Sequence, residues 1–266
     1  MPCVSVIIPA LRARDTLPDA LASVAAAGLP PAEIEVVLAP DDGDDYAGLP
    51  DFGLSLVRCA AHHVASGAGA ARNRALARAR GRIVAFLDAD DTWEAGYLAA
   101  LVPLAQAHGV AFGRTRVLDG DRALMELPAP GRRHLTIADL GSGASFHPVM
   151  ARALAGPFRS LPAQDVLHAA EALSAAGGAA PLGSTRYNLH LHPGSATADR
   201  GFALRVQAAY ARILREIETG RTRLRPEDRC AARSAFQARA RLNRAYMRRG
   251  GTVPFYQYLH RQGLAD

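Results

Sequence analysis

The chain has 266 residues, 49% of them hydrophobic and 21% charged, a balance that supplies a large core and excludes a globally disordered protein. Its net charge of +6 is uneven, because 15 arginines face five acids from Arg200 onward, whereas the preceding residues carry 16 arginines and 20 acids. Three scattered cysteines indicate neither a disulfide framework nor a zinc site. No run approaches the ~20 apolar residues that cross a bilayer, and no signal peptide is expected. We therefore expect a cytoplasmic protein whose basic C-terminal part attracts an anionic partner.

The first half alternates segments typical of strands with segments typical of helices, which predicts an α/β sheet. Strands are expected at the β-branched or apolar runs 4–10, 33–40, 54–59, 82–88 and 110–118. Helices are expected between them at residues 15–28, 66–81 and 92–109.

The second half is less regular, with a turn-rich link near residues 128–131, a predicted helix at 164–177 and a predicted strand at 184–197. After residue 200 an apolar stripe with helical spacing predicts an amphipathic helix: Val206, Tyr210, Ile213, Leu214 and Ile217. A further helix is expected from Pro226 to about Arg249. These segments predict a main domain at 1–199 and a basic helical extension at 200–266.

A glycine loop at Gly67-x-Gly69, followed by a helix, a strand and Asp88, imitates a dinucleotide-binding fingerprint. Two features oppose this interpretation. Arg72 stands where the fingerprint has its third glycine, and seven residues separate the loop from the preceding strand. A Rossmann-type dehydrogenase is therefore the remote alternative.

The stretch FLDADDTW places Asp88 and Asp90 at the end of an apolar strand. In an extended segment alternate side chains share a face, so both carboxylates can approach one cation. Hard oxygen ligands suit Mg²⁺ or Mn²⁺, which share their remaining positions with substrate phosphates. The alternative is a solvated acidic turn, because D-x-D alone is a common pattern.

Several motifs in order resemble the family 2 glycosyltransferases of the GT-A fold. They are VSVIIPA, GAARNRALARARGRIVAFLDADDTWEAGYL, QDVL and YNLHLHPGSAT, which together span residues 4–197. The resemblance implies an α/β GT-A-like fold, a mixed and mostly parallel sheet flanked by helices. It also implies an inverting, metal-dependent sugar transferase of bacterial polysaccharide synthesis.

By this resemblance Asp90 is the principal metal ligand, with help from Asp88 and His192, and the ion is Mn²⁺ or Mg²⁺. Asp88 is also expected to face the ribose of the donor. His192 is preferred to His190 as the metal-side histidine. Asp91 is expected to cap the following helix rather than to join the metal.

The resemblance implies a nucleotide-diphosphate sugar as donor, with a UDP-sugar favoured. Residues expected to contact the nucleotide part are Pro9, Ala10, Asp42, Arg72, Asp88 and Ser195. Pro9 and Ala10 would face the base through their backbone, Arg72 would reach nucleotide or phosphate, and Ser195 would contact phosphate. Asp42 is preferred to Asp41 as the acid that recognises the base.

Asp165 of the QDVL element is the candidate catalytic base, since an inverting transfer needs a carboxylate near the acceptor hydroxyl. Its alternative role is that of an acidic residue at a helix N-terminus. Gln164 stands where the family usually has a first acid. This substitution supports the other hypothesis, a catalytically silent relative that binds nucleotide-sugar or scaffolds a synthesis complex. His147 is expected to be an ordinary loop histidine, with a place in the acceptor pocket as the alternative.

The acceptor is expected to be a saccharide or a lipid-linked sugar. The arginines of the C-terminal extension, together with the aromatic residues of the last segment, suit peripheral contact with the inner, anionic face of a membrane. A homodimer through the same apolar stripe is the alternative. Nucleic acid is not expected as a partner, because the extension carries no recognisable reading motif.

Overall fold

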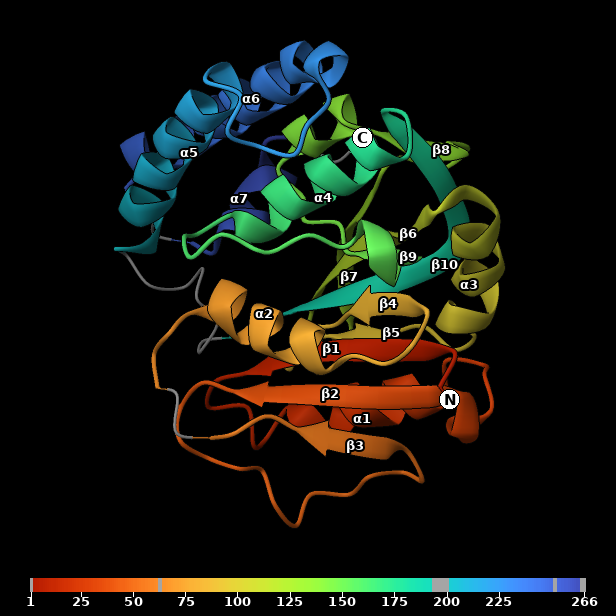
Figure 1. Ribbon diagram of the computed structural model, residues 1–266. Helices are drawn as coiled ribbons and strands as arrows, with labels where there is room; N and C mark the ends of the chain where they lie inside the picture. The colour runs from red at the N-terminus through yellow and green to blue at the C-terminus, as the bar shows by residue number, and fades with distance from the viewer. Residues whose placement is uncertain (1, 62–63, 193–200, 251–252, 264–266) are drawn as a thin grey trace.

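Ten strands form one mixed sheet in the computed structural model, which describes residues 2–61, 64–192, 201–250 and 253–263 (Figure 1). The strands are β1 (Val4–Ala10), β2 (Ile34–Pro40), β3 (Ser55–Arg58), β4 (Ile83–Phe86), β5 (Thr92–Trp93), β6 (Val110–Asp119), β7 (Arg122–Leu127), β8 (His134–Thr136), β9 (Pro148–Ala151) and β10 (Ala179–Leu191). The helices are α1 (Leu17–Ala25), α2 (Ala68–Arg78), α3 (Tyr97–His108), α4 (Gln164–Ala175), α5 (Phe202–Glu218), α6 (Arg229–Arg248) and α7 (Phe255–Arg261).

The sheet has the order β3-β2-β1-β4-β9-β6-β10-β5, with β7 paired to β6 and β8 paired to β10. Strands β3, β2, β1 and β4 are parallel, as are β6 and β10. Strand β9 runs antiparallel to both of its neighbours, β4 and β6, and so joins the two parallel groups. This arrangement confirms the mixed α/β sheet predicted from the sequence.

Both faces of the sheet are covered by helices, which is why β1 and β2 are almost wholly apolar, with Ser5 and Glu35 as the polar exceptions. Along β1, Val4, Val6 and Ile8 belong to one core cluster, together with side chains of α1 and α3. Ile7 belongs to the other cluster, which includes side chains of α2, α4 and the C-terminal helices. The period of two along the strand thus assigns alternate residues to the two layers.

Tertiary pairing produces several differences from the predicted elements. Thr92 and Trp93 form strand β5 against Asn188 and Tyr187 of β10, so α3 begins five residues later than expected, after Gly96. The irregular middle contains the short strands β7, β8 and β9. Strands β8 and β9 have too few residues for a clear local pattern and pair with distant strands, whereas β7 forms a hairpin with the preceding strand β6.

The C-terminal helices pack against the rest of the chain (Figure 1). The predicted stripe of α5 is buried at Val206, Tyr210, Ile213 and Ile217, inside a core cluster shared with residues before 199. The stripe is therefore occupied within the chain, and the idea that it forms a homodimer interface is wrong. The predicted boundary between 199 and 200 adjoins residues outside the described part and stays a prediction.

The aromatic residues of the last segment are also core residues. Tyr256, Tyr258 and Leu259 of α7 are buried, and α7 contacts β7. The interpretation of these aromatics as interfacial anchors is therefore wrong. Within the described residues, no helix combines the length and apolar character needed to cross a membrane.

Arg239 of α6 ties the C-terminal helices to the loop before β9. Its side chain is 5% exposed and donates hydrogen bonds to the carbonyl oxygens of Leu140, Gly143 and Ala144 at 2.8–3.0 Å. It also donates to the hydroxyl of Tyr210 at 3.1 Å. One buried guanidinium thus donates to three carbonyl oxygens of a loop that belongs to no β-strand.

His168 of α4 is buried between aromatic rings. Its ring stacks on Phe158 at a centroid distance of 3.9 Å and meets the ring of Phe86 edge to face at 5.1 Å. Burial, reinforced by the charge of Arg72, lowers the pKa of His168 from 6.5 to about 3. The folded protein therefore holds this histidine neutral.

The buried neutral histidine predicts a loss of stability in mild acid. The unfolded chain protonates His168 below its ordinary pKa of about 6.5, whereas the folded state does not until about pH 3, so stability falls as the pH drops through this window. Between pH 7 and pH 5 the protonation of His168 in the unfolded chain lowers the free energy of unfolding by about 2 kcal/mol. Urea unfolding at both pH values should show a smaller loss in His168→Phe than in the unmodified protein. Equal losses in the two proteins would contradict the assignment.

Candidate active site

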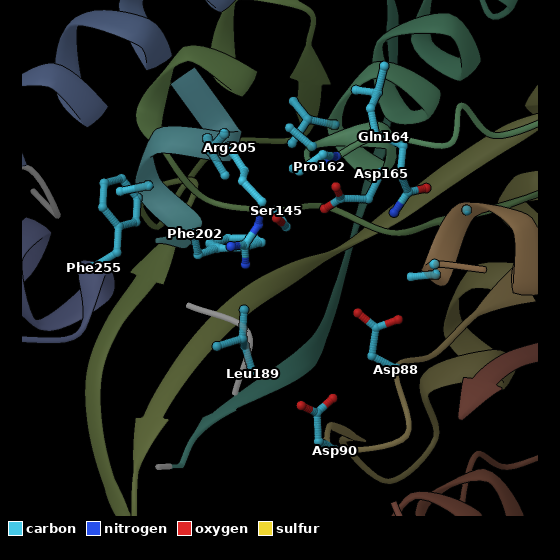
Figure 2. Close-up of a pocket in the computed structure, with 18 of the residues that line it drawn as sticks. Asp88, Asp90, Ser145, Pro162, Gln164, Asp165, Leu189, Phe202, Arg205 and Phe255 are labelled. Atoms are coloured by element: carbon cyan, nitrogen blue, oxygen red, sulfur yellow. The ribbon is translucent and has the colours of Figure 1, made fainter. Parts of the chain in front are cut away.

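A cavity of about 910 Å³ opens beside the carboxyl ends of β1, β2 and β4, the edge where open α/β sheets bind ligands (Figure 2). Its walls come from the loops after these strands, from the start of α2 and α4, from the end of β10, and from α5, α6 and α7. Segments far apart in the sequence therefore meet at one site.

Arg72 and Asp88 form an ion pair in the cavity wall, in which Arg72 is buried and the side chain of Asp88 is 31% exposed. The guanidinium of Arg72 is 2% exposed, contacts a carboxylate oxygen of Asp88, and lies 5.4 Å from the ring centre of Phe158. Burial alone would raise the pKa of Asp88, but the charges of Arg72 and His147 hold it below its ordinary value. Two further nitrogens of Arg72, Nε and Nη1, are buried without a hydrogen-bond partner among the described residues. They are donors to which a ligand can bind.

Asp90 and His190 line the cavity, and His192, which is not a lining residue, contacts Asp90, with its Nε2 2.9 Å from Oδ2. The side chains of Asp90 and His192 are about a third exposed. His190 instead contacts the hydroxyl of Thr92 at 2.8 Å. The structure therefore brings together the preferred histidine and the aspartate predicted as the principal metal ligand.

The Asp90–His192 pair fits a hard divalent cation that also binds phosphate. In the part of the chain described here, no group of three or more His, Cys, Asp or Glu side chains could hold a metal on its own. Mg²⁺ typically takes one or two carboxylates and completes its shell with water and substrate phosphates. The chemistry of the two side chains thus suits an ion that arrives with a diphosphate.

Asp91 does not cap the following helix, so that prediction is wrong. The residue is 5% exposed and accepts hydrogen bonds from the hydroxyl of Tyr187 at 2.8 Å and from the backbone N–H of His190 at 2.9 Å. Burial, with the charges of Asp90 and Asp88, raises its pKa well above the ordinary value. Asp91 instead connects the aspartate turn to β10.

Of the two aspartates after β2, Asp41 lines the cavity. Its buried carboxylate accepts hydrogen bonds from the hydroxyl of Ser66 and from the N–H of Gly67 at 2.8 Å, which holds the glycine loop against the end of β2. Asp42 accepts from the hydroxyl of Tyr46 at 2.6 Å and from the N–H of Arg12, beside the end of β1. The base-recognising role of Asp42 stays a prediction.

Pro9 and Ala10 end strand β1, where the carbonyl oxygen of Ala10 accepts the N–H of Asp41 at 2.8 Å. The next residue, Leu11, is 58% exposed and lines the cavity. The expected contact of Pro9 and Ala10 with the base stays a prediction. Ser195 lies outside the described residues.

The glycine loop has a packing role in this fold. A Cβ atom on Gly69 would lie 2.2 Å from the carbonyl oxygen of Arg159, so only glycine allows α2 to approach that backbone. Gly67 has a φ of +90°, a conformation that side chains disfavour. Both glycines are thus required by the chain itself, without a dinucleotide.

Asp165 lies in the first turn of α4 and lines the cavity. In Figure 2 its carboxylate points into the cavity from the side opposite to Asp88 and Asp90. Gln164, which replaces the usual acid, is buried, and its Oε1 has no hydrogen-bond partner among the described groups. The arrangement leaves a space between Asp165 and Asp90 in which two substrates can meet.

Several cavity residues were missed by the sequence reasoning. His147, for which the sequence offered a place in a pocket only as the alternative, is buried and lines the cavity, and its ring stacks on Tyr187 at 4.4 Å. Phe202, Arg205 and Phe255 of the C-terminal helices also line the cavity. No local signal identifies them, because they lie outside the recognised motifs and reach the site through the packing of helices.

Comparison with known proteins identifies the family to which this chain belongs. Residues 5–151 match the family described as Glycosyl transferase family 2, over more than half of the chain, and the chain belongs to this family. This match excludes the Rossmann-type dehydrogenase.

Two bacterial relatives are similar in sequence. One is the UDP-Glc:alpha-D-GlcNAc-diphosphoundecaprenol beta-1,3-glucosyltransferase WfgD of Escherichia coli, 30% identical over 131 residues that cover 48% of this chain and 51% of the relative. The other is the putative teichuronic acid biosynthesis glycosyltransferase TuaG of Bacillus subtilis (strain 168), 37% identical over 120 residues that cover 43% and 46%. The chain spans about half the length of the curated relatives it matches.

Solved structures confirm the GT-A fold. The S. aureus TarS 1–349 structure in complex with UDP-GlcNAc has a TM-score of 0.66 at 20% identity, and the match covers 90% of this chain and 72% of that chain. The mannosyltransferase PcManGT from Pyrobaculum calidifontis, in complex with GDP-Man and Mn²⁺, has a TM-score of 0.53 at 17% identity and covers 98% and 79%.

Proposed function

We propose that the chain is a metal-dependent, inverting glycosyltransferase of bacterial polysaccharide synthesis. It would transfer a sugar from a nucleotide-diphosphate sugar, with a UDP-sugar favoured, to a saccharide or lipid-linked acceptor. The observation that carries this proposal is one cavity lined by Asp90, Arg72 and Asp165, with His192 in contact with Asp90. The name of the E. coli relative, with its UDP-Glc donor and diphosphoundecaprenol-linked acceptor, supports the substrate classes.

The donor diphosphate would bind between Asp90, His192 and Arg72. A bound Mn²⁺ or Mg²⁺ ion supplies positive charge to the leaving diphosphate, and Asp90 with His192 would hold it. The buried, unpartnered nitrogens of Arg72 would donate to the phosphate or the sugar. Asp88, fixed by Arg72, would accept hydrogen bonds from the ribose hydroxyls.

Asp165 would accept the proton of the acceptor hydroxyl. An inverting transfer brings this hydroxyl to the sugar from the face opposite to the leaving group. Asp165 lies across the cavity from Asp90, as that geometry requires (Figure 2). The acceptor oxygen forms the new bond to the anomeric carbon while the nucleoside diphosphate leaves.

A catalytically silent relative is the second candidate, and Gln164 is the feature that favours it. Such a protein would bind nucleotide-sugar without transferring it. The presence of Asp165 in the cavity favours the enzyme.

Removing the carboxylate of Asp90 should abolish metal-dependent donor binding. In thermal-shift measurements UDP with Mn²⁺ should raise the Tm of the unmodified protein by several degrees, and chelation by EDTA should reverse the shift. Asp90→Ala should lose the Mn²⁺-dependent part, while Asp121→Ala, an exposed aspartate of the β6–β7 turn, should keep it. An unchanged Mn²⁺-dependent shift in Asp90→Ala would rule out this ligand.

Replacing Asp165 by Asn should separate catalysis from binding. We expect kcat for transfer to fall by roughly 10²–10⁴-fold, the usual contribution of a general base. The Kd for the UDP-sugar with Mn²⁺, measured by calorimetry, should change by less than about twofold. Full transfer activity in Asp165→Asn would sink the assignment. Donor binding without any transfer by the unmodified protein would favour the silent relative.

We also propose contact between α6 and the inner face of an anionic membrane. Three exposed arginines, Arg241, Arg244 and Arg248, lie on one face of the helix at 100° per residue, while Arg239 is buried on the opposite face. Arg233, on the same exposed face, is paired with Glu218 at 3.4 Å. Each arginine near an anionic membrane surface contributes about 1 kcal/mol to the free energy of attraction to the headgroups.

Cosedimentation with vesicles tests this contact. The protein should bind phosphatidylglycerol vesicles at low salt and release them as salt rises, because the attraction is screened. A variant with Arg241, Arg244 and Arg248 changed to Gln should bind more weakly, and neutral phosphatidylcholine vesicles should bind neither protein. Equal binding to both lipids, or no binding, would refute the proposal.

A further inference from the structure

His147 is a cavity residue to which the proposed function gives no role. It lines the cavity, is 6% exposed, and lies directly before β9. Strand β9 runs antiparallel to β4 with Val149 opposite Ala85, so residue 147 lies beside the end of β4, where Asp88 begins the aspartate turn. The fold thus places an imidazole next to the residues that would bind the donor.

The ring of His147 is held in place by Tyr187 of β10. The two rings are stacked, with their centres 4.4 Å apart and their planes at 16°. The hydroxyl of Tyr187 accepts a hydrogen bond from the N–H of Asp88 at 3.1 Å and donates one to Asp91 at 2.8 Å. Because Pro148 follows His147, the backbone of the histidine is also restricted to extended conformations. These contacts fix the orientation of the imidazole before any ligand binds.

The ring nitrogens of His147 have no hydrogen-bond partner within the part of the chain that the structure describes. His190, which also lines the cavity, contacts the hydroxyl of Thr92 at 2.8 Å. Buried polar side chains are nearly always hydrogen-bonded in native structures, and one without a partner needs an explanation. A ligand in the cavity would supply the partner that the imidazole lacks.

The charges around His147 indicate where that ligand would lie. Burial lowers the pKa of His147, and the carboxylates of Asp88 and Asp165 oppose this effect, so the imidazole is within electrostatic reach of both. Asp165 faces Asp88 and Asp90 across the cavity in Figure 2. The donor sugar would lie between these two sides, because its anomeric carbon is bonded to the diphosphate and is attacked by the acceptor hydroxyl.

A neutral imidazole suits a sugar hydroxyl better than a phosphate. It has one N–H donor and one acceptor nitrogen, and a hydroxyl group can both donate and accept. A phosphate only accepts, and a cationic donor such as Arg72 binds it more strongly. The lowered pKa keeps the imidazole of His147 neutral at pH 7. Its chemistry therefore matches the uncharged part of a nucleotide-diphosphate sugar.

We infer that His147 binds a hydroxyl group of the donor sugar and so helps to select that sugar. The inference rests on the proposed function, because it takes the diphosphate to bind at Asp90 and the acceptor proton to go to Asp165. His147 takes no part in the proton transfer, since the hydroxyl that it contacts is unchanged by the reaction.

Calorimetry in the presence of Mn²⁺ tests this contact. The probes are UDP, UDP-glucose, UDP-galactose and UDP-N-acetylglucosamine. His147→Phe keeps a ring that can stack on Tyr187 and removes both nitrogens. It should weaken binding of the tightest UDP-sugar by about tenfold, equivalent to about 1.4 kcal/mol. The Kd for UDP should change by less than about twofold, because UDP carries the ribose and the diphosphate but no donor sugar.

Deoxy analogues of the tightest UDP-sugar, each lacking one hydroxyl, identify the contacted group without depending on the folding of a variant. At least one analogue should bind the unmodified protein about tenfold more weakly than the parent compound does. His147→Phe should bind that analogue and the parent equally, because in each case the same hydrogen bond is already lost.

His168→Phe is the matched control. His168 is also buried and stacked on an aromatic ring, that of Phe158 at 3.9 Å, but it does not line the cavity. This variant should leave the Kd values for UDP and for the UDP-sugars within about twofold of those of the unmodified protein.

Two results would overturn the inference. One is that His147→Phe changes the affinities for UDP and for the UDP-sugar equally, or changes neither. The other is an equal loss in His147→Phe for the parent UDP-sugar and for every deoxy analogue. Absence of UDP binding in the unmodified protein would instead overturn the proposed function, so the two failures are distinguishable.

Discussion

The ion pair of Arg72 and Asp88 is the constraint on which the site depends. A guanidinium that is 2% exposed needs a hydrogen-bonded anion, because an uncompensated buried charge is strongly destabilising. Asp88, at the end of β4, supplies it and thereby fixes α2 against the sheet. The other two aspartates of the turn are then free for different contacts. Asp90 reaches the cavity mouth, and Asp91 turns inward toward Tyr187.

The sequence predicts the strand before the aspartates, because the apolar run that ends before Asp88 is a local signal. The extended segment expected at the aspartates themselves is wrong: residues 88–91 form a turn in which the N–H of Asp91 donates to the carbonyl oxygen of Asp88 at 3.1 Å, so strand alternation does not set the directions of these side chains. The orientation of Asp91 was not predictable, because its partner Tyr187 lies 96 residues further along the chain. Strand β10 supplies that partner only after it has entered the sheet beside β6.

The C-terminal helices illustrate the same limit on a larger scale. Helical periodicity predicts correctly that Val206 and Ile213 face a core, but periodicity names no partner for that face. The core proved to be the chain's own, which removes the apolar stripe from any interface. Because α5 packs against the chain's own core, residues beside the stripe, such as Phe202, line the cavity. Their position follows from how the helices dock, and that information is not contained in the spacing of apolar residues.

The contacts of Arg239 limit which parts of this fold can be exchanged independently of one another. The loop that it holds, residues 140–144, leads directly to Ser145 and His147 in the cavity wall. A chimera that exchanges the C-terminal helices for those of a relative would change the residues that these helices contribute to the cavity wall. It would also leave three loop carbonyls without donors unless the graft carried an arginine at the matching position. Loop and helices must therefore be exchanged together.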